Sequence, residues 1–422
     1  MFYVDFVRHQ TINVQAVSAD VFSVKEDIYV AMASPGSDSC VVMEWDHIEM
    51  NFRKFDNIPG ESVAGCKSVV IRDHVLLLVA RRLGGSHLYR FDKAQNRFVP
   101  FQTLLEEDEG LEGRLKGSPQ SPPNVSQEPA DIEVFRLDGD WYLALVLDGT
   151  YSTVLYKWTQ GLQITNKTTN QTTRAGESRL FSFLPYQSLS GGTEGEEEGS
   201  QWSRTTDIEF VSRDDGEAGS IHYLVVSGRS RATPALYLWS RTTRRFQPHG
   251  KIPASSTEDQ VLGVKAFCPP ADEGSRDTYL ALACYIGDSR VLRWTTTTAG
   301  KQPQFTEVQV LPSRGAMVLQ PFVVMEDQGR QDQQGQGDQY LALGSDFSFT
   351  RIYRWDSESR RFARHREVYV QSPRSFSPVV DSDLVGDRNP GDRDRRRRSF
   401  VFSCSLRGKS TVFEHLVVDL SL

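Results

Sequence analysis

Short apolar runs of strand character recur in pairs along the whole 422-residue chain. In each pair, a run of β-branched, aromatic and small residues is followed, after a polar turn, by a second run that ends in an aromatic residue or His. The pattern occurs seven times, and equivalent residues of the two runs are 15 or 16 positions apart, as between Tyr340 and Trp355 or Tyr29 and Trp45. A constant internal spacing with variable connections predicts a repeated β-hairpin.

Further strand-like runs flank most of these hairpins, for example at 131–135 and 98–101. Four short antiparallel strands in each of seven repeats, at about 60 residues per repeat, predict an all-β, seven-bladed β-propeller with four-stranded antiparallel blades. A pair of β-sandwiches also contains many short strands, but it does not repeat one hairpin seven times at one spacing. The propeller is therefore the predicted fold.

Polar, low-complexity insertions interrupt the repeats and are too polar to offset the entropy of ordering them. We expect them to be disordered loops, near 106–128, 188–200, 326–338 and 385–398. The propeller itself is expected to span residues 13–422, after a separate N-terminal segment at 1–12.

Composition and charge exclude several classes of protein. Hydrophobic residues make up 38% of the chain and aromatic residues 10%, which suffices for a packed core. The net charge of -7 disfavours nucleic acid and anionic membrane surfaces as partners. No apolar run is long enough to insert into a membrane, and the start of the chain lacks the residue order of a signal peptide.

Enzyme motifs are absent from the sequence. It contains no G-x-S-x-G, no P-loop and no H-E-x-x-H, and its eight His residues do not pair at ligand spacing. We therefore expect no catalysis. Trp-Asp dipeptides at 45–46 and 355–356 are typical of intracellular WD-repeat scaffolds, although the accompanying Gly-His is missing. An intracellular protein-interaction scaffold is thus the alternative function.

Two aspartates open the same D-I-E tripeptide in consecutive repeats, Asp131 and Asp207. In a propeller, the first strand of every blade borders the central channel, so these carboxylates should lie close together. They would repel unless a cation or a proton lies between them. Calcium, completed by backbone carbonyls and water, is one occupant. Alternatively, both side chains accept hydrogen bonds from neighbouring backbone N–H groups.

Cysteines and sequons bear on the compartment. Five cysteines show no CxxC pair, and an odd number permits one or two disulfides without settling where the protein resides. Three N-x-S/T sequons lie in polar stretches, which favours a secreted protein. The candidate glycosylation sites are Asn124, Asn166 and Asn170.

Several segments resemble the epitempin (EAR or EPTP) repeat domain of the leucine-rich glioma-inactivated (LGI) family, most of all its member two. The segments that carry this resemblance are 44–53, 84–87, 286–291, 311–317, 344–346 and the ending 415–422. The resemblance covers essentially the whole chain. It implies a secreted neuronal glycoprotein whose propeller binds the ectodomain of catalytically inactive ADAM-family transmembrane receptors at synaptic or axonal contacts. Family members carry a signal peptide and leucine-rich repeats ahead of the propeller, so we expect this sequence to be a fragment or a truncated gene model.

The resemblance also implies roles for individual residues. Cys40 and Cys66 match a disulfide between neighbouring blades, and Asp131 and Asp207 match a structural calcium site in the channel. In the family, an aromatic-rich receptor loop enters an apolar opening. The matching positions here are Leu262, Met317 and Leu406, and Arg204 matches a basic contact beside them. Arg314 matches a contact with the leucine-rich repeats of a second family molecule.

Overall fold

The computed structural model describes residues 2–25, 27–72, 74–82, 85–104, 128–148, 152–160, 181–190, 205–214, 219–228, 233–253, 259–270, 277–295, 303–324, 337–379 and 399–419. Within these residues the fold is all-β, apart from one 3-10 turn, η1 (Pro35–Ser37). No helix in the described part of the chain has the length and apolar character needed to cross a membrane.

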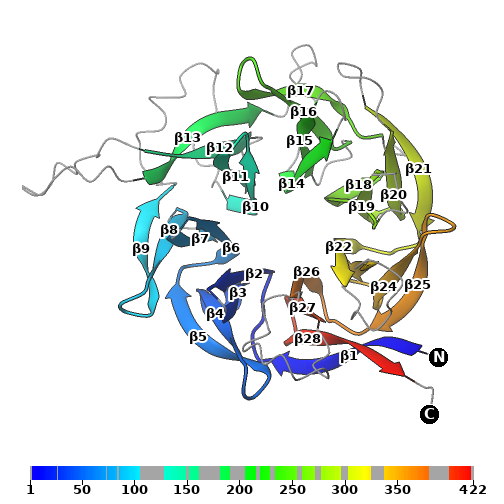
Figure 1. Ribbon diagram of the computed structural model, residues 1–422, viewed down its shortest axis with the longest axis horizontal. Coiled ribbons are helices and arrows are strands. Elements are labelled where there is room, and N and C mark those ends of the chain that lie inside the picture. Colours follow the sequence, from blue (N-terminus) through cyan, green and yellow to red (C-terminus); the bar gives the residue numbers. More distant parts are fainter. Residues whose placement is uncertain are drawn as a thin grey trace, which may run out of the picture.

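The described strands form seven four-stranded antiparallel sheets around a central channel, as the hairpin spacing predicted (Figure 1). Six blades consist of four consecutive strands, innermost strand first. Blades one to three are β2 (Ser18–Val24), β3 (Asp27–Ser34), β4 (Ser39–Asp46), β5 (Asn51–Pro59); β6 (Val63–Ile71), β7 (His74–Arg81), β8 (His87–Asp92), β9 (Arg97–Thr103); and β10 (Glu128–Leu137), β11 (Asp140–Asp148), β12 (Ser152–Gln160), β13 (Phe181–Ser190). Blades four to six are β14 (Thr205–Asp214), β15 (Ser220–Gly228), β16 (Ala235–Ser240), β17 (Arg245–Lys251); β18 (Gln260–Phe267), β19 (Thr278–Ile286), β20 (Ser289–Thr295), β21 (Gln304–Leu311); and β22 (Ala316–Val324), β23 (Asp338–Ser345), β24 (Thr350–Asp356), β25 (Arg361–Val368).

The seventh blade joins the two ends of the chain. It contains β26 (Pro373–Val379), β27 (Ser399–Ser405), β28 (Ser410–Asp419) and, as its outermost strand, β1 (Phe2–Ile12). Residues 2–12 are thus part of the propeller. The prediction of a separate N-terminal segment at 1–12 is therefore wrong. The outer strand has its pairing partner about 400 residues away, so no local pattern reveals it. Figure 1 shows the two ends side by side.

Packing between blades explains the apolar runs of the sequence. The second strand of a blade contacts a neighbouring blade on each face, so β3 is buried from Ile28 to Ser34. Outer strands are more exposed, and in β5 only Phe52 and Ile58 are buried. The described core residues form seven clusters, one at each junction between adjacent blades. Because each junction buries both of its faces, the ring closes on itself.

One covalent link reinforces a blade junction. Cys40 on β4 and Cys66 on β6 form a disulfide with a Cα–Cα distance of 6.4 Å, joining the first two blades as the family resemblance implied. The four insertions lie outside the described residues, except where their ends belong to strands: Glu128 in β10, 188–190 in β13 and Asp338 in β23 with Gly337 before it.

Candidate functional site at the channel mouth

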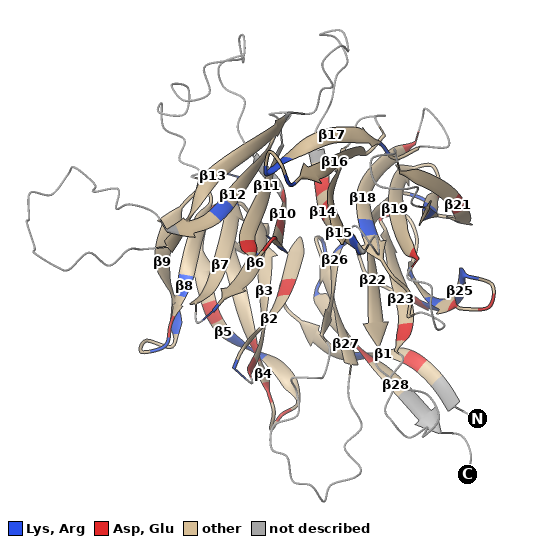
Figure 2. Ribbon diagram, turned by 45° about the horizontal axis from the view of Figure 1, so that its top comes forward, with Lys and Arg blue, Asp and Glu red and all other residues tan. Residues whose placement is uncertain are grey.

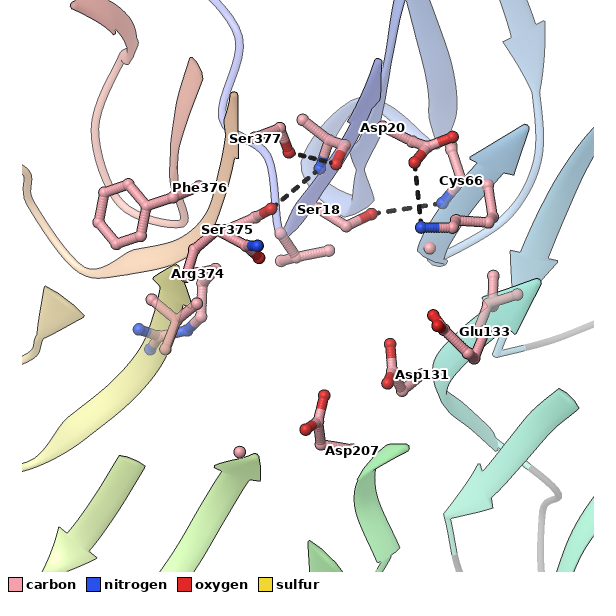
Figure 3. A pocket seen from close by; sticks show the side chains of 18 of the residues that line it. Ser18, Asp20, Cys66, Asp131, Glu133, Asp207, Arg374, Ser375, Phe376 and Ser377 are labelled. Carbon is pink, nitrogen blue, oxygen red and sulfur yellow. Dashed lines mark hydrogen bonds and ion pairs between the residues drawn. The ribbon is translucent and has the colours of Figure 1, made fainter. Parts of the chain in front are cut away.

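A cavity of about 430 Å³ occupies the centre of the ring and is lined by side chains from all seven innermost strands. Charged residues of both signs lie on these strands (Figure 2). In Figure 3, Asp131, Glu133 and Asp207 point into the cavity from β10 and β14. The repeated D-I-E tripeptide therefore does bring its carboxylates together at the channel wall.

Both aspartates accept a hydrogen bond from the next blade. Asp131 Oδ2 accepts the N–H of Ile208 at 2.9 Å, and Asp207 Oδ2 accepts the N–H of Val264 at 2.7 Å. The alternative of backbone capping is thus realised for one oxygen of each carboxylate. The same blade-to-blade link recurs around the ring, with Ser18 accepting from Cys66, Asp20 from Ser68 and Ser375 from Ala19.

Two lysines on the channel wall pair with acids of the preceding blade. Lys265 Nζ lies 3.1 Å from Asp207 Oδ1 and 2.9 Å from Glu209 Oε2. Lys67 Nζ lies 3.1 Å from Asp20 Oδ1. Burial lowers the pKa of Lys265, but the negative charges of Asp207 and Glu209 outweigh it, and the pKa is raised well above its ordinary value. Asp207 and Glu209 therefore both have a positively charged partner.

Among the described residues, no lysine or arginine forms an ion pair with either acid of the third blade, Asp131 or Glu133, and the pKa of each is raised. Desolvation in the channel wall, followed by the negative charge of Asp207, raises the pKa of Asp131 well above its ordinary value. Desolvation also raises the pKa of Glu133 to about 7, although the charge of Lys67 opposes the rise. An excess of negative charge thus lies between β10 and β14, which a proton or a bound cation would relieve.

These residues partly fit a hard cation. Asp131 and Asp207 each have one oxygen that no backbone N–H holds, and carboxylate oxygens are the donors calcium prefers. In the described residues, no three His, Cys, Asp or Glu side chains are grouped to hold a metal ion. A cation here would therefore rest on the two aspartates with carbonyls or water, as the sequence predicted. It would also have to contend with Lys265 at Asp207.

The structure brings two of the predicted receptor-binding residues together. Leu262 on β18 and Met317 on β22 line the same cavity, and Leu262 is 8% exposed. Leu406 does not line it; this residue follows β27, and its N–H donates to the carbonyl of Ser372 at 3.0 Å, immediately before β26. All three lie on the face where the innermost strands begin. Arg204 lies outside the described residues.

The remaining predicted sites lie at the surface or outside the described residues. Arg314 is exposed just before β22, on the same face as Met317. The three sequons fall outside the described residues: Asn124, Asn166 and Asn170.

Exposed aromatic side chains extend the apolar surface near Arg314. Phe347, 68% exposed, packs over Gly315, where a Cβ atom would lie 2.4 Å from its ring. Phe349 and Tyr369 are 54% and 70% exposed and contact each other with ring centroids 5.9 Å apart. The sequence reasoning missed this patch, because Phe347 and Phe349 lie in the turn of the sixth hairpin and Tyr369 in the loop after β25, outside the strand runs that define the repeat. Exposed apolar clusters of this kind are typical of protein-interaction surfaces.

The sequence reasoning also missed Glu133, Glu209, Lys67 and Lys265. Side chains two positions apart on a strand face the same way, so the Glu of D-I-E borders the channel as its Asp does. That signal was available in the tripeptide. The lysines stand at equivalent positions of β6 and β18, but the equivalence becomes visible only in the hydrogen bonds between blades beside them.

Together these features define a seven-bladed β-propeller whose channel mouth combines an ionic wall with an apolar edge. The EPTP domain family matches residues 5–46 and 51–92 of this chain. Leucine-rich repeat LGI family member 2 from Mus musculus is 40% identical over 420 residues, covering 99% of this chain and 60% of that protein. Member 3 from Macaca fascicularis is 36% identical over 421 residues, and leucine-rich glioma-inactivated protein 1 from Homo sapiens 32%, with the same coverage.

These findings confirm the predicted resemblance to the LGI family and its epitempin repeats, and the higher identity to member 2 agrees with it. The chain spans about 60% of the length of the curated relatives it matches. Among solved structures, Saccharomyces cerevisiae Sqt1 has a TM-score of 0.52 at 11% identity, covering 97% of this chain and 98% of that one. A putative 6-phosphogluconolactonase from Bacteroides fragilis has a TM-score of 0.50 at 11% identity, covering 85% and 86%. Identity this low shows a shared fold alone.

Proposed function

We propose that this propeller is the receptor-binding module of a secreted, non-enzymatic LGI-type ligand. Its partner is the ectodomain of a catalytically inactive ADAM-family transmembrane receptor at neuronal or synaptic contacts. The observation that carries the proposal is the position of Leu262 and Met317 on the wall of one cavity at the channel mouth. Such an opening suits an aromatic side chain presented by a protein loop.

The energetics of such an anchor are favourable. An aromatic side chain buries roughly 150 to 250 Å², which at about 25 cal/mol per Å² contributes on the order of 4 to 6 kcal/mol before the costs of association. A few anchors in a desolvated pocket with a polar rim carry most of the binding energy of a protein interface. Phe347 and Tyr369 offer additional apolar surface on the same face.

Cysteine chemistry supports an extracellular location over the intracellular scaffold. Disulfides persist in oxidising compartments and are rare in the cytosol, and Cys40 and Cys66 form one. Burial raises the pKa of the Cys284 and Cys404 thiols to about 12, which leaves both unreactive. Cys268 is a third free cysteine and is exposed, so the bridge, rather than the free thiols, is what favours a secreted protein.

Three further roles complete the proposal. Calcium, bound by Asp131 and Asp207, would neutralise the charge between β10 and β14 and so stabilise the channel. Arg314, exposed at the mouth, would contact the leucine-rich repeats of a second family molecule. Glycans would occupy the three sequons: Asn124, Asn166 and Asn170.

Binding to a panel of ADAM ectodomains, measured by biolayer interferometry with the disulfide-intact chain, tests the function. We expect specific binding to catalytically inactive members and none to active members. Failure of the folded chain to bind any inactive member would contradict the proposal. Binding of cytosolic propeller partners instead would favour the scaffold.

Melting curves test the calcium site separately. A ligand present at 100 times its Kd stabilises the folded state by about 2.7 kcal/mol. EDTA should therefore lower the melting temperature of the parent, and Asp131→Asn should remove that sensitivity. An identical melting curve with and without EDTA would rule out a structural calcium ion.

A further inference from the structure

The two channel lysines occupy equivalent places in a repeated arrangement. Lys67 pairs with Asp20 of the preceding blade at 3.1 Å, while the neighbouring N–H of Ser68 donates to the other Asp20 oxygen at 2.7 Å. Lys265 repeats this geometry on Glu209, at 2.9 Å, with the N–H of Ala266 donating to the other oxygen at 3.0 Å. Each lysine thus forms an ion pair with an acid of the preceding blade, and the N–H of the next residue donates to the same carboxylate.

Lys265 makes one contact that Lys67 does not. Its ammonium also lies 3.1 Å from Asp207 Oδ1, two residues before Glu209 on the same face of β14. The other oxygen, Asp207 Oδ2, already accepts the N–H of Val264. Both oxygens of Asp207 are therefore engaged, and a metal ion on this carboxylate would have to displace or share the lysine.

The acid at the corresponding position of the third blade has no lysine opposite it in the next blade. Glu133 stands on β10 where Asp20 stands on β2, and the next blade presents Glu209 in place of a lysine. Among the described residues, the lysine that contacts the acidic group of β10 and β14 is Lys265, through Asp207 and Glu209. Lys67 contacts Asp20 and acts on Glu133 only at longer range. Removing the charge of Lys265 leaves that acidic group without its contacting cation.

We propose that Lys265 is a built-in cation that competes with calcium for Asp207 and thereby sets the calcium affinity of the channel. The inference rests on the proposed calcium site at Asp131 and Asp207. With Lys265 in place, the acids are partly neutralised and the metal-free propeller is stable. Without its charge, the metal-free channel is destabilised by repulsion and calcium becomes the main counter-ion.

The experiment compares four proteins by isothermal titration calorimetry with CaCl₂ and by melting in EDTA and in calcium. Lys265→Met removes the charge, Lys265→Arg retains it, and Lys67→Met is the matched control at the equivalent position. We expect Lys265→Met to bind calcium at least about tenfold more tightly than the parent, because a divalent ion beside an ammonium is repelled by more than the ~1.4 kcal/mol that tenfold represents. Its melting temperature should fall in EDTA and recover in calcium.

The other variants should behave differently. Lys265→Arg should keep the parent's calcium affinity. Lys67→Met should change it much less than Lys265→Met does, because Lys67 contacts Asp20 and acts on Asp131 only at longer range. Equal or weaker calcium binding by Lys265→Met, with measurable binding by the parent, would overturn the inference and leave the calcium site standing. Calcium binding by none of the four proteins would overturn both. If Lys265→Met does not fold in EDTA, refolding it in calcium and in magnesium gives the same comparison, and equal recovery in the two would count against the inference.

Discussion

The closing blade contains a histidine that should make the propeller sensitive to acid. His415 on β28 lies between the outer strand β1 and the sixth blade: its ring centroid is 5.1 Å from that of Phe6 and 5.5 Å from that of Tyr340. The Tyr340 hydroxyl lies 3.2 Å from His415 Nε2. Burial is the main cause that lowers the pKa of His415 to about 4, with His365 and Arg354 acting in the same direction and Asp338 against it.

The sign and size of the effect follow from linkage. The unfolded imidazole has a pKa of about 6.5, so between pH 6.5 and 4 the unfolded state binds a proton that the folded state does not. Stability is therefore lost as pH falls through 6.5. With a folded pKa of about 4, the loss from this one group is about 2 kcal/mol at pH 5 and at most about 3 kcal/mol at lower pH.

Urea unfolding of the parent and of His415→Gln at pH 7.5 and pH 5 measures this contribution. The difference between the two proteins is the relevant quantity, because Glu133, with its pKa raised to about 7, stabilises the folded state as pH falls. We expect His415→Gln to lose about 2 kcal/mol less than the parent between the two pH values. His47→Gln, on an exposed turn, controls for the substitution. Equal losses in parent and His415→Gln would refute the reasoning.

Two further predictions concern the closing strand and the disulfide. Phe6→Ala removes a ring that is 2% exposed and packed in the last blade junction, so it should lower the free energy of urea unfolding by about 3 to 5 kcal/mol. Phe349→Ala, at an exposed site, should lower it by less than about 0.5 kcal/mol. Similar losses in the two variants would mean that β1 does not close the ring. Replacing both Cys40 and Cys66 with Ala should cost about 2 to 4 kcal/mol, and free thiols at both positions in a non-reducing peptide map of the parent would reject the bridge.

The fold was predictable because its signal is local and repeated. The spacing between paired strands, such as Tyr340 on β23 and Trp355 on β24, is a property of one hairpin and survives variable connections. The outer strand β1 was not predictable in the same way. It pairs with β28 across nearly the whole sequence, and its residues resemble any edge strand.

The channel was predictable only where residue types repeat. Asp131 and Asp207 stood out because two blades carry the same tripeptide. Lys67 and Lys265 occupy matching positions, but Glu133, Glu209 and other types fill that position elsewhere, so the sequence does not display the equivalence. Contact between a lysine and the acid of the preceding blade depends on how blades pack, which no single repeat encodes.

The proposed receptor site rests most directly on Met317. Met317→Asp places a carboxylate on the cavity wall, where an entering aromatic side chain would desolvate it without a partner at a cost of several kcal/mol. Ile48→Asp is the matched control, because Ile48 is 93% exposed on the β4–β5 turn at the opposite face. The deciding measurement is the affinity of parent, Met317→Asp and Ile48→Asp for the ADAM ectodomain that the parent binds. We predict that Met317→Asp, while folded, loses binding and Ile48→Asp retains it; a folded Met317→Asp that binds as tightly as the parent would place the receptor site elsewhere.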